Sequence, residues 1–239
     1  MRFDLDFMLL VIKEVIYKLP VNIMLATNAF ALGLFLAVVI TVIRFYRLRF
    51  VIKIIDFYIS LARGIPLYLQ IVLFFFGLPI VLKTLADALG MEFSIRHFSP
   101  AASVVAALTF NVTASLSESL RGGVAGIRRG EIEAGHSIGM TLWQILHRVV
   151  VPQSAVLCLP NFCVLFIGLV HSTTLAFGAT IIEMNGQASL LADDNGRYFE
   201  AFLAAGIFFW AITLVIQKIF KLLENHFIAK TKLNHADAQ

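Results

Sequence analysis

Charged residues are scarce in this sequence. Of its 239 residues, 14% are Asp, Glu, Lys or Arg, whereas a typical soluble domain has about 25%. Hydrophobic residues make up 59% of the chain. This composition argues against a water-soluble domain and predicts that a lipid bilayer is the solvent.

The sequence also lacks the motifs of several function classes. Its two cysteines, Cys158 and Cys163, lack the paired spacing of a zinc site and are interpreted as small buried hydrophobic residues. No Gly-x4-Gly-Lys-Ser/Thr loop is present, which excludes an ATP site of that type in this chain. The net charge is +4, but Lys and Arg alternate between loops, so no binding of nucleic acid is expected.

Long apolar runs are present instead. Hydropathy predicts five membrane spans, at residues 22–43, 54–82, 99–120, 154–182 and 198–220. Each reaches the roughly 20 residues that a helix needs to cross about 30 Å of hydrocarbon. The fold class is therefore predicted to be all-α and membrane-integral. The second span contains Gly64 and Pro66, which favour a broken or tilted helix.

The basic residues predict the orientation, because Lys and Arg are retained mostly on the cytoplasmic side. Twelve lie in segments 44–53, 121–148 and 218–232, and six lie in segments 2–18 and 83–96 and at position 197. We therefore expect an extracytoplasmic amphipathic helix over 1–18, a membrane domain over 19–223 and a cytoplasmic tail over 224–239.

Residues 121–152 form a polar loop of a length that usually has a function. Glycines follow the third span, a short polar run covers 131–137, and Gly139 is a helix stop before a second amphipathic run. The pattern predicts two short helices at a bend. Taken alone, it also fits an ordinary helical hairpin with solvated charges.

The loop resembles the signature of permease subunits of binding-protein-dependent ABC importers. That signature is Glu-Ala-Ala, three residues, Gly, nine residues, then Ile-x-Leu-Pro. The matching positions are Glu133, Ala134, Gly135, Gly139, Val149, Val151 and Pro152. In that family the segment forms a coupling helix that docks in a groove of the ATPase. The resemblance assigns ATPase coupling to Glu133, Ala134, Gly135, Gly139 and Pro152.

Three further runs are similar to the polar amino-acid branch of the family, of the histidine, glutamine and cystine type. They are Arg63-Gly64-Ile65-Pro66-Leu67 with Gln70 and Phe76-Gly77-Leu78-Pro79; Ala114 with Glu118, Arg121, Gly122 and Gly123; and Ser172-Thr173-Thr174-Leu175. Ile65, Ser115 and His171 depart from the usual residues of that branch. The likeness covers roughly residues 20–223.

The resemblance implies a type I importer permease in a bacterial inner membrane. Its partners would be two cytoplasmic ATP-binding subunits, a second permease copy or homologue, and an extracytoplasmic solute-binding protein. The substrate would be a polar or sulfur-containing amino acid, moved by alternating access. The chain itself would hold no cofactor, since ATP and magnesium would be bound by the partner ATPase.

Polar residues within the predicted spans are the candidates for the substrate path, because charges at membrane depth usually face a protein interior or water. They are Arg63, Gln70, Asn111, Ser115, Glu118, Ser172, Thr173 and Thr174. In the functional interpretation, Arg63 attracts a carboxylate and Glu118 an ammonium group. In the structural alternative, Glu118 pairs with Arg121, Arg63 caps carbonyls at the kink, and the polar stripes join helices.

Two other function classes, a secondary transporter and an intramembrane enzyme, make different demands on the sequence. An ion-driven secondary transporter would need no partner ATPase and would give the long loop no particular role. An intramembrane enzyme would need a nucleophile or metal set at membrane depth. Gly135 to Gly139 matches Gly-x-Ser-x-Gly, but the strand, turn and helix which that motif requires are not expected here.

Overall fold

The computed structural model describes residues 3–45 and 49–236, and the secondary structure in these ranges is helical. In chain order the elements are α1 (Leu5–Ile16), α2 (Leu19–Phe45), α3 (Arg49–Gly64), α4 (Leu67–Ala88), η1 (Ile95–His97), α5 (Pro100–Ala125), α6 (Arg129–Ser137), α7 (Leu142–Ile145), η2 (Leu146–Val150), α8 (Val151–Ser172), η3 (Thr173–Ala179), α9 (Met184–Asn195) and α10 (Tyr198–Ala236).

Five helical stretches in the described ranges are long and apolar enough to cross a membrane. They are Leu19–Arg44, Leu67–Ala88, Pro100–Ala125, Leu142–Ala179 and Tyr198–Ile228. This confirms the predicted all-α membrane fold.

Helix α5 is the centre of the bundle and packs against α2, α3, α4 and α8. Of its most apolar stretch, 56% is buried, against 28% or less in the other four candidate spans. Gly33 of α2 faces the side chain of Val112 on α5 at close range, as small residues allow where membrane helices cross. The other spans expose large apolar side chains such as Phe35 and Trp210, as expected where lipid or another subunit covers them.

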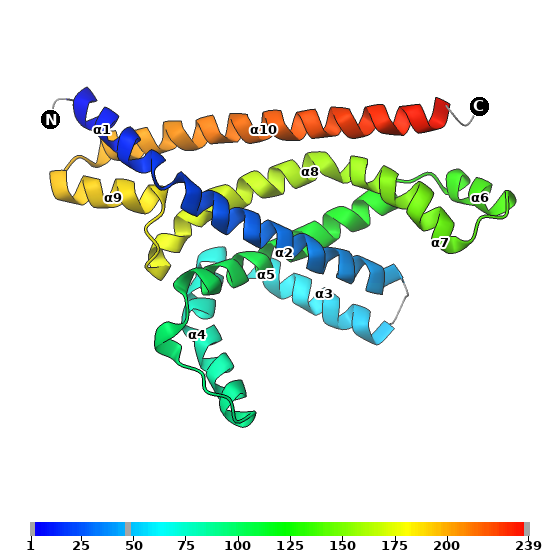
Figure 1. The fold of residues 1–239 in the computed structure, drawn as a ribbon, viewed down its shortest axis with the longest axis horizontal. Coiled ribbons are helices and arrows are strands. Elements are labelled where there is room, and N and C mark those ends of the chain that lie inside the picture. Colours follow the sequence, from blue (N-terminus) through cyan, green and yellow to red (C-terminus); the bar gives the residue numbers. More distant parts are fainter. Residues whose placement is uncertain (1–2, 46–48, 237–239) are drawn as a thin grey trace.

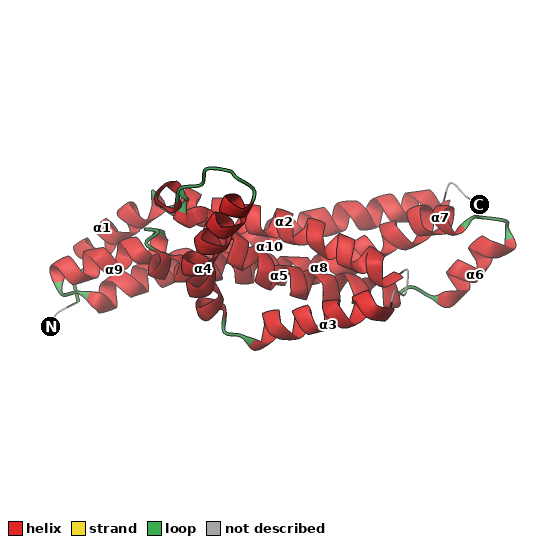
Figure 2. Cartoon of the chain, turned by 90° about the horizontal axis from the view of Figure 1, so that it is seen from below, coloured by secondary structure: helices red, strands yellow, loops and turns green. Residues whose placement is uncertain are grey.

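The molecule is elongated, and its two ends differ. Figure 1 shows α1 and α9 at one end and α6, α7 and the end of α10 at the other. Figure 2 shows the same separation from a perpendicular direction. Helix α4 leaves the bundle at a steep angle.

The second predicted span, 54–82, is divided between two helices. α3 ends at Gly64, and α4 begins at Leu67, directly after Pro66. Proline has no N–H to continue the hydrogen-bond ladder, and its ring obstructs the preceding turn. α3 is not among the five candidate spans. The single predicted span is therefore replaced by a separate helix and a span over Leu67–Ala88.

The fourth predicted span, 154–182, also has different bounds. The helical stretch runs from Leu142 to Ala179 and stops at Thr180, whose φ of 64° lies in the left-handed region. Helix α9, which follows, was not expected from hydropathy because its composition is mostly polar and small. It packs against α10 and α1.

Helix α1 lies on the bundle at the end opposite α6. Its buried residues Val11 and Val15 pack with alanines of α9 and α10. Asp4 caps the helix by accepting a hydrogen bond from the Phe7 N–H, and it also pairs with Arg197 at 3.0 Å. The outer face is apolar as well and includes exposed Leu9, which suits a helix at a lipid surface.

Candidate functional site: a polar groove and a projecting helix

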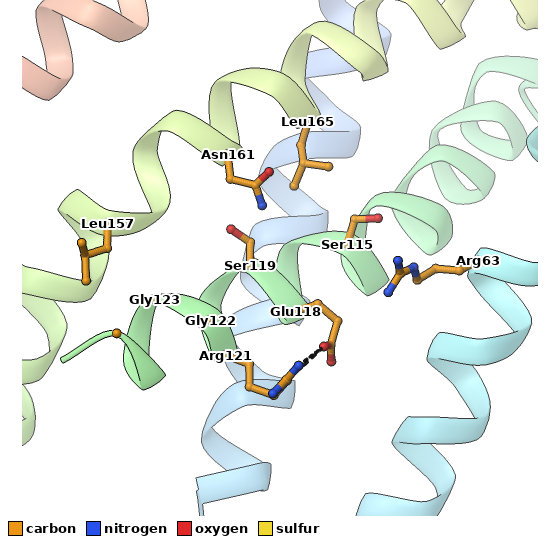
Figure 3. Close-up of a pocket in the computed structure, with 11 residues that line it drawn as sticks. Arg63, Ser115, Glu118, Ser119, Arg121, Gly122, Gly123, Leu157, Asn161 and Leu165 are labelled. Carbon is orange, nitrogen blue, oxygen red and sulfur yellow. Dashed lines mark hydrogen bonds and ion pairs between the residues drawn. The ribbon is translucent and has the colours of Figure 1, made fainter. Parts of the chain in front are cut away.

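An open groove of about 700 Å³ lies between the end of α3, the second half of α5 and the middle of α8. Its lining residues are Arg63, Ser115, Glu118, Ser119, Arg121, Gly122, Gly123, Gly126, Leu157, Asn161 and Leu165. Figure 3 shows Arg63 reaching from α3 toward the side of α5 that carries Ser115 and Glu118. Of the predicted path residues, the groove brings together Arg63, Ser115 and Glu118, and it adds Asn161.

Glu118 is held by two arginines. Its Oε1 accepts from Arg44 Nη1 at 2.6 Å, and its Oε2 accepts from Arg121 Nε at 2.9 Å and Nη2 at 2.7 Å. Arg44 also pairs with Asp56 of α3. The pairing of Glu118 with Arg121 is the one that the structural alternative expected from the sequence. The pairing with Arg44, 74 positions away, was not expected.

Arg63 differs from these arginines because no ion pair or hydrogen bond joins its guanidinium to any residue within 3–45 or 49–236. Its side chain is exposed and lines the groove. The structural alternative expected Arg63 to cap carbonyls at the helix break, and Arg63 does not do so. Arg63 therefore remains a free cation beside polar groups of α5 and α8.

Gln70 and Asn111 stabilise the break between α3 and α4. Gln70 is 2% exposed, and its Nε2 donates to the carbonyl oxygens of Ala62 and Ile65 at 2.8 Å each. Asn111 Nδ2 donates to the same Ala62 oxygen at 3.0 Å and to Gln70 Oε1 at 3.3 Å. The two side-chain amides replace, at the Ala62 carbonyl, the N–H that Pro66 lacks. The side chains of Gln70 and Asn111 therefore both have a structural role.

Replacing Gln70 with leucine is expected to lower the free energy of unfolding by about 1–3 kcal/mol, because the Ile65 carbonyl loses its side-chain donor and Asn111 loses the Gln70 acceptor, while Ala62 keeps only Asn111. Thermal melting of the purified complex in detergent measures this loss. The matched control is Gln187→Leu on α9; the Gln187 side chain makes no hydrogen bond to the residues that the structure describes. Unchanged melting with weakened substrate binding in Gln70→Leu would instead place Gln70 in the path.

Ser172, Thr173 and Thr174 lie at the end of α8 and the start of η3, and none of them lines the groove. Thr173 is fully buried; its Oγ1 donates to the Val170 carbonyl at 2.6 Å and accepts from Asn22 Nδ2 at 2.7 Å. Thr174 Oγ1 donates to the His171 carbonyl at 2.8 Å. These hydroxyls therefore serve helix geometry and packing in this structure.

Asn22 and Glu183 form a buried polar cluster with Thr173 that the sequence did not reveal. Asn22 Nδ2 also donates to Glu183 Oε2 at 3.1 Å, and Asn22 Oδ1 accepts from the Met184 N–H at 3.1 Å. Glu183 caps α9 by accepting from the N–H groups of Asn185 and Gly186 at 2.8 Å each. Burial raises the pKa of the Glu183 carboxyl, although these hydrogen bonds act in the opposite direction.

Helix α6 projects from the end of the bundle opposite α1 (Figure 1). Glu133 and Ala134 are exposed on it, whereas Gly135 is buried. A Cβ at Gly135 would lie 3.0 Å from Cγ1 of Ile145, so the glycine allows α6 to pack closely on the segment that follows. Gly139 ends the helix with a φ of 79°, as a left-handed glycine cap does.

Helix α6 is attached to the beginning of α8. Ile127, Ile145 and Val150 form a small apolar cluster, and Gln153 donates a hydrogen bond to Glu131. The connecting segment η2 is a π-helix, in which the Val151 N–H donates to the Leu146 carbonyl. Pro152 follows and has no N–H for the carbonyl four residues earlier. The wider turn is compatible with the missing N–H of Pro152.

The described residues contain no group of three or more His, Cys, Asp and Glu side chains placed to hold a metal ion.

The sequence is similar to known transport proteins. Residues 19–228 match the family described as binding-protein-dependent transport system inner membrane component. The chain is 32% identical to the probable amino-acid ABC transporter permease protein PatM of Vibrio harveyi, over 99% of both chains. It is 28% identical to the L-cystine transport system permease protein TcyL of Bacillus subtilis, covering 86% of this chain and 84% of the relative.

The fold is similar to solved transporter structures. A crystal structure of an amino acid ABC transporter with histidines superposes with a TM-score of 0.79 at 23% identity, over 95% of this chain and 100% of that chain. The MetNI methionine ABC transporter in an inward-facing conformation superposes with a TM-score of 0.64 at 15% identity, over 94% and 99%. These matches establish the fold.

Proposed function

Because the chain belongs to the family of inner-membrane components of binding-protein-dependent transport systems, we propose that it is the permease subunit of an ABC importer for an amino acid. It is a multi-pass membrane protein and a translocation subunit. ATP is hydrolysed on separate subunits, where ATP and magnesium are bound.

Helix α6 is the observation that carries the coupling function. Its exposed residues Glu133 and Ala134 are available to a partner, while Gly135 holds the helix against Ile145. This geometry suits a short helix that inserts into a groove of an ATPase subunit. Gly139 shapes the turn before α7. Pro152 shapes the wider turn that follows α7. A push on α6 would then move α8, which forms one wall of the groove.

The remaining partners follow from the family. Two ATP-binding subunits would bind at the α6 end; that end and the tail would then be cytoplasmic, and the α1 end would lie outside. A second permease copy or homologue would cover the exposed faces of the spans. A solute-binding protein would deliver the amino acid at the α1 end.

The groove supports the proposed substrate path. Arg63, Ser115 and Asn161 present a cation, a hydroxyl and an amide to it. Gln70 and Asn111 shape its wall through the helix break, and Thr173 and Thr174 bond to carbonyls at the end of α8, where Ser172 also lies. The relatives include an L-cystine permease, which favours a polar or sulfur-containing amino acid as cargo.

Uptake of labelled amino acids into proteoliposomes tests this function. The vesicles contain this chain with its candidate ATPase and binding protein. We expect uptake that requires ATP and falls by about tenfold or more in Glu133→Lys, because like charges brought together at an interface cost several kcal/mol and about 1.4 kcal/mol already corresponds to a factor of ten.

The control is Asp194→Lys, which reverses an exposed carboxylate on α9 at the opposite end; it should retain binding of the ATPase subunits, whereas Glu133→Lys should weaken that binding. Uptake that persists without the ATPase would refute the ABC assignment and favour a secondary transporter.

A further inference from the structure

The groove carries more positive than negative charge. Three arginines lie in or beside it, Arg44, Arg63 and Arg121, and they face two carboxylates, Asp56 and Glu118. The two carboxylates are both engaged by Arg44, and Glu118 is also engaged by Arg121. One positive charge, that of Arg63, is therefore left without a counter-charge among the described residues.

Glu118 is not free to bind an ammonium group. Three N–H donors at 2.6–2.9 Å from two arginines already occupy both of its oxygens. An amino acid with a cationic side chain would have to displace one of these arginines or lie beside Arg121, whose side chain is 61% exposed. Like charges within a few ångström disfavour binding.

Arg63 has the properties of a carboxylate-binding residue. Its guanidinium offers a planar fork of donors, and it points toward the groove in Figure 3. A free charge in a membrane-spanning chain is costly unless it faces water or a ligand. The groove also supplies neutral acceptors for an α-ammonium group, the hydroxyls of Ser115 and Ser119 and the amide oxygen of Asn161.

We infer that this groove selects amino acids by charge: Arg63 binds a carboxylate of the cargo, and side chains that are anionic or neutral are accepted in preference to cationic ones. The inference rests on the proposed transport function and narrows its substrate class. Arg63 is then a specificity-determining residue, and Glu118 is a structural counter-ion that neutralises Arg44 and Arg121.

Equilibrium binding of three labelled probes tests the inference. The complex of this chain with its ATPase and permease partner is placed in lipid nanodiscs, without ATP and without binding protein. L-glutamate should bind at least about tenfold more tightly than L-arginine, since one uncompensated charge at close range acts in opposite directions on the two probes. L-glutamine should lie between them.

Three variants of α3 distinguish an effect of the groove from an effect of surface charge in general. Arg63→Glu should reverse the order, so that L-arginine binds more tightly than L-glutamate, and Arg63→Gln should remove most of the difference. Lys53→Glu makes the same charge reversal on α3 outside the groove and should retain the wild-type order. Unchanged melting temperatures show that the variants are folded.

The inference fails if wild-type complex binds L-arginine as tightly as L-glutamate, or if it binds neither at millimolar concentration. It also fails if Arg63→Glu keeps the wild-type order or if Lys53→Glu reverses it. ATP-dependent uptake by the same complex with its binding protein is a separate readout. Failure of the charge selection with intact uptake would leave the proposed function standing.

Discussion

Replacing Asn22 with leucine is expected to lower the free energy of unfolding by about 3 kcal/mol. Asn22 is fully buried and joins α2 to Thr173 and to Glu183. The change removes two donated hydrogen bonds and leaves the Met184 N–H without its acceptor. Each buried polar group that loses its partner costs roughly 1–3 kcal/mol. Glu183 would keep only its backbone donors.

Denaturation of the purified complex by heat and by detergent titration measures this effect. Asn28→Leu is the matched control on the same helix, because Asn28 is exposed and its side chain donates to the Met24 carbonyl one turn earlier, within its own helix. Backbone amide exchange at Met184 should become faster in Asn22→Leu and stay unchanged in the control. Equal losses of stability in the two variants would contradict the structural role given to the buried cluster.

Gly123 is expected to tolerate no side chain. A Cβ at this position would collide with Cys158 Sγ and lie 3.1 Å from the backbone oxygen of Ser154. Because this oxygen is part of the α8 backbone, the clash can be relieved only if α5 and α8 move apart. Gly123→Ala should therefore lower the free energy of unfolding by about 2–3 kcal/mol, the cost of overpacking a tight core, and should impair uptake by shifting α8.

The neighbouring glycine provides the control. A Cβ at Gly122 would meet no atom within 4 Å, so Gly122→Ala should be neutral or slightly stabilising, as alanine favours the helix. In the double variant Gly123→Ala with Cys158→Ala, part of the loss should be recovered, because the sulfur is gone. A Gly123→Ala complex as stable as wild type would show that α5 and α8 are not in tight contact here.

The fold class follows from local features of the chain. Hydropathy and length predicted five membrane helices because a helix satisfies its own backbone hydrogen bonds and needs only apolar side chains to enter lipid. Pro66 predicted a break, and Gly139 predicted a helix end, through backbone chemistry that acts at the residue itself. The projecting helix with Glu133 and Ala134 was predicted from a motif whose spacing is local.

The site was predicted less completely, because its contacts join distant segments. Asp56, Arg63 and Gln70 recur every seven residues, a spacing that would put the three side chains on one helical face if the kink at Pro66 were mild. The helix ends at Gly64, so Gln70 lies on α4 and turns into the break. Asp56 stays on α3 with Arg63 but pairs with Arg44, and of the three residues Arg63 lines the groove. A period of seven places residues together only while the helix continues.

The sequence by itself determined that the chain is a membrane protein, how many of its helices can cross the bilayer, and which segment forms a short helix at one end of the bundle. Only the tertiary structure decided how each polar residue is used. Glu118 meets Arg44, and Asn22 meets Glu183, across 74 and 161 positions of the chain. Such pairs depend on how helices are rotated and placed against one another. That arrangement is set by side-chain packing between helices, which local periodicity does not specify.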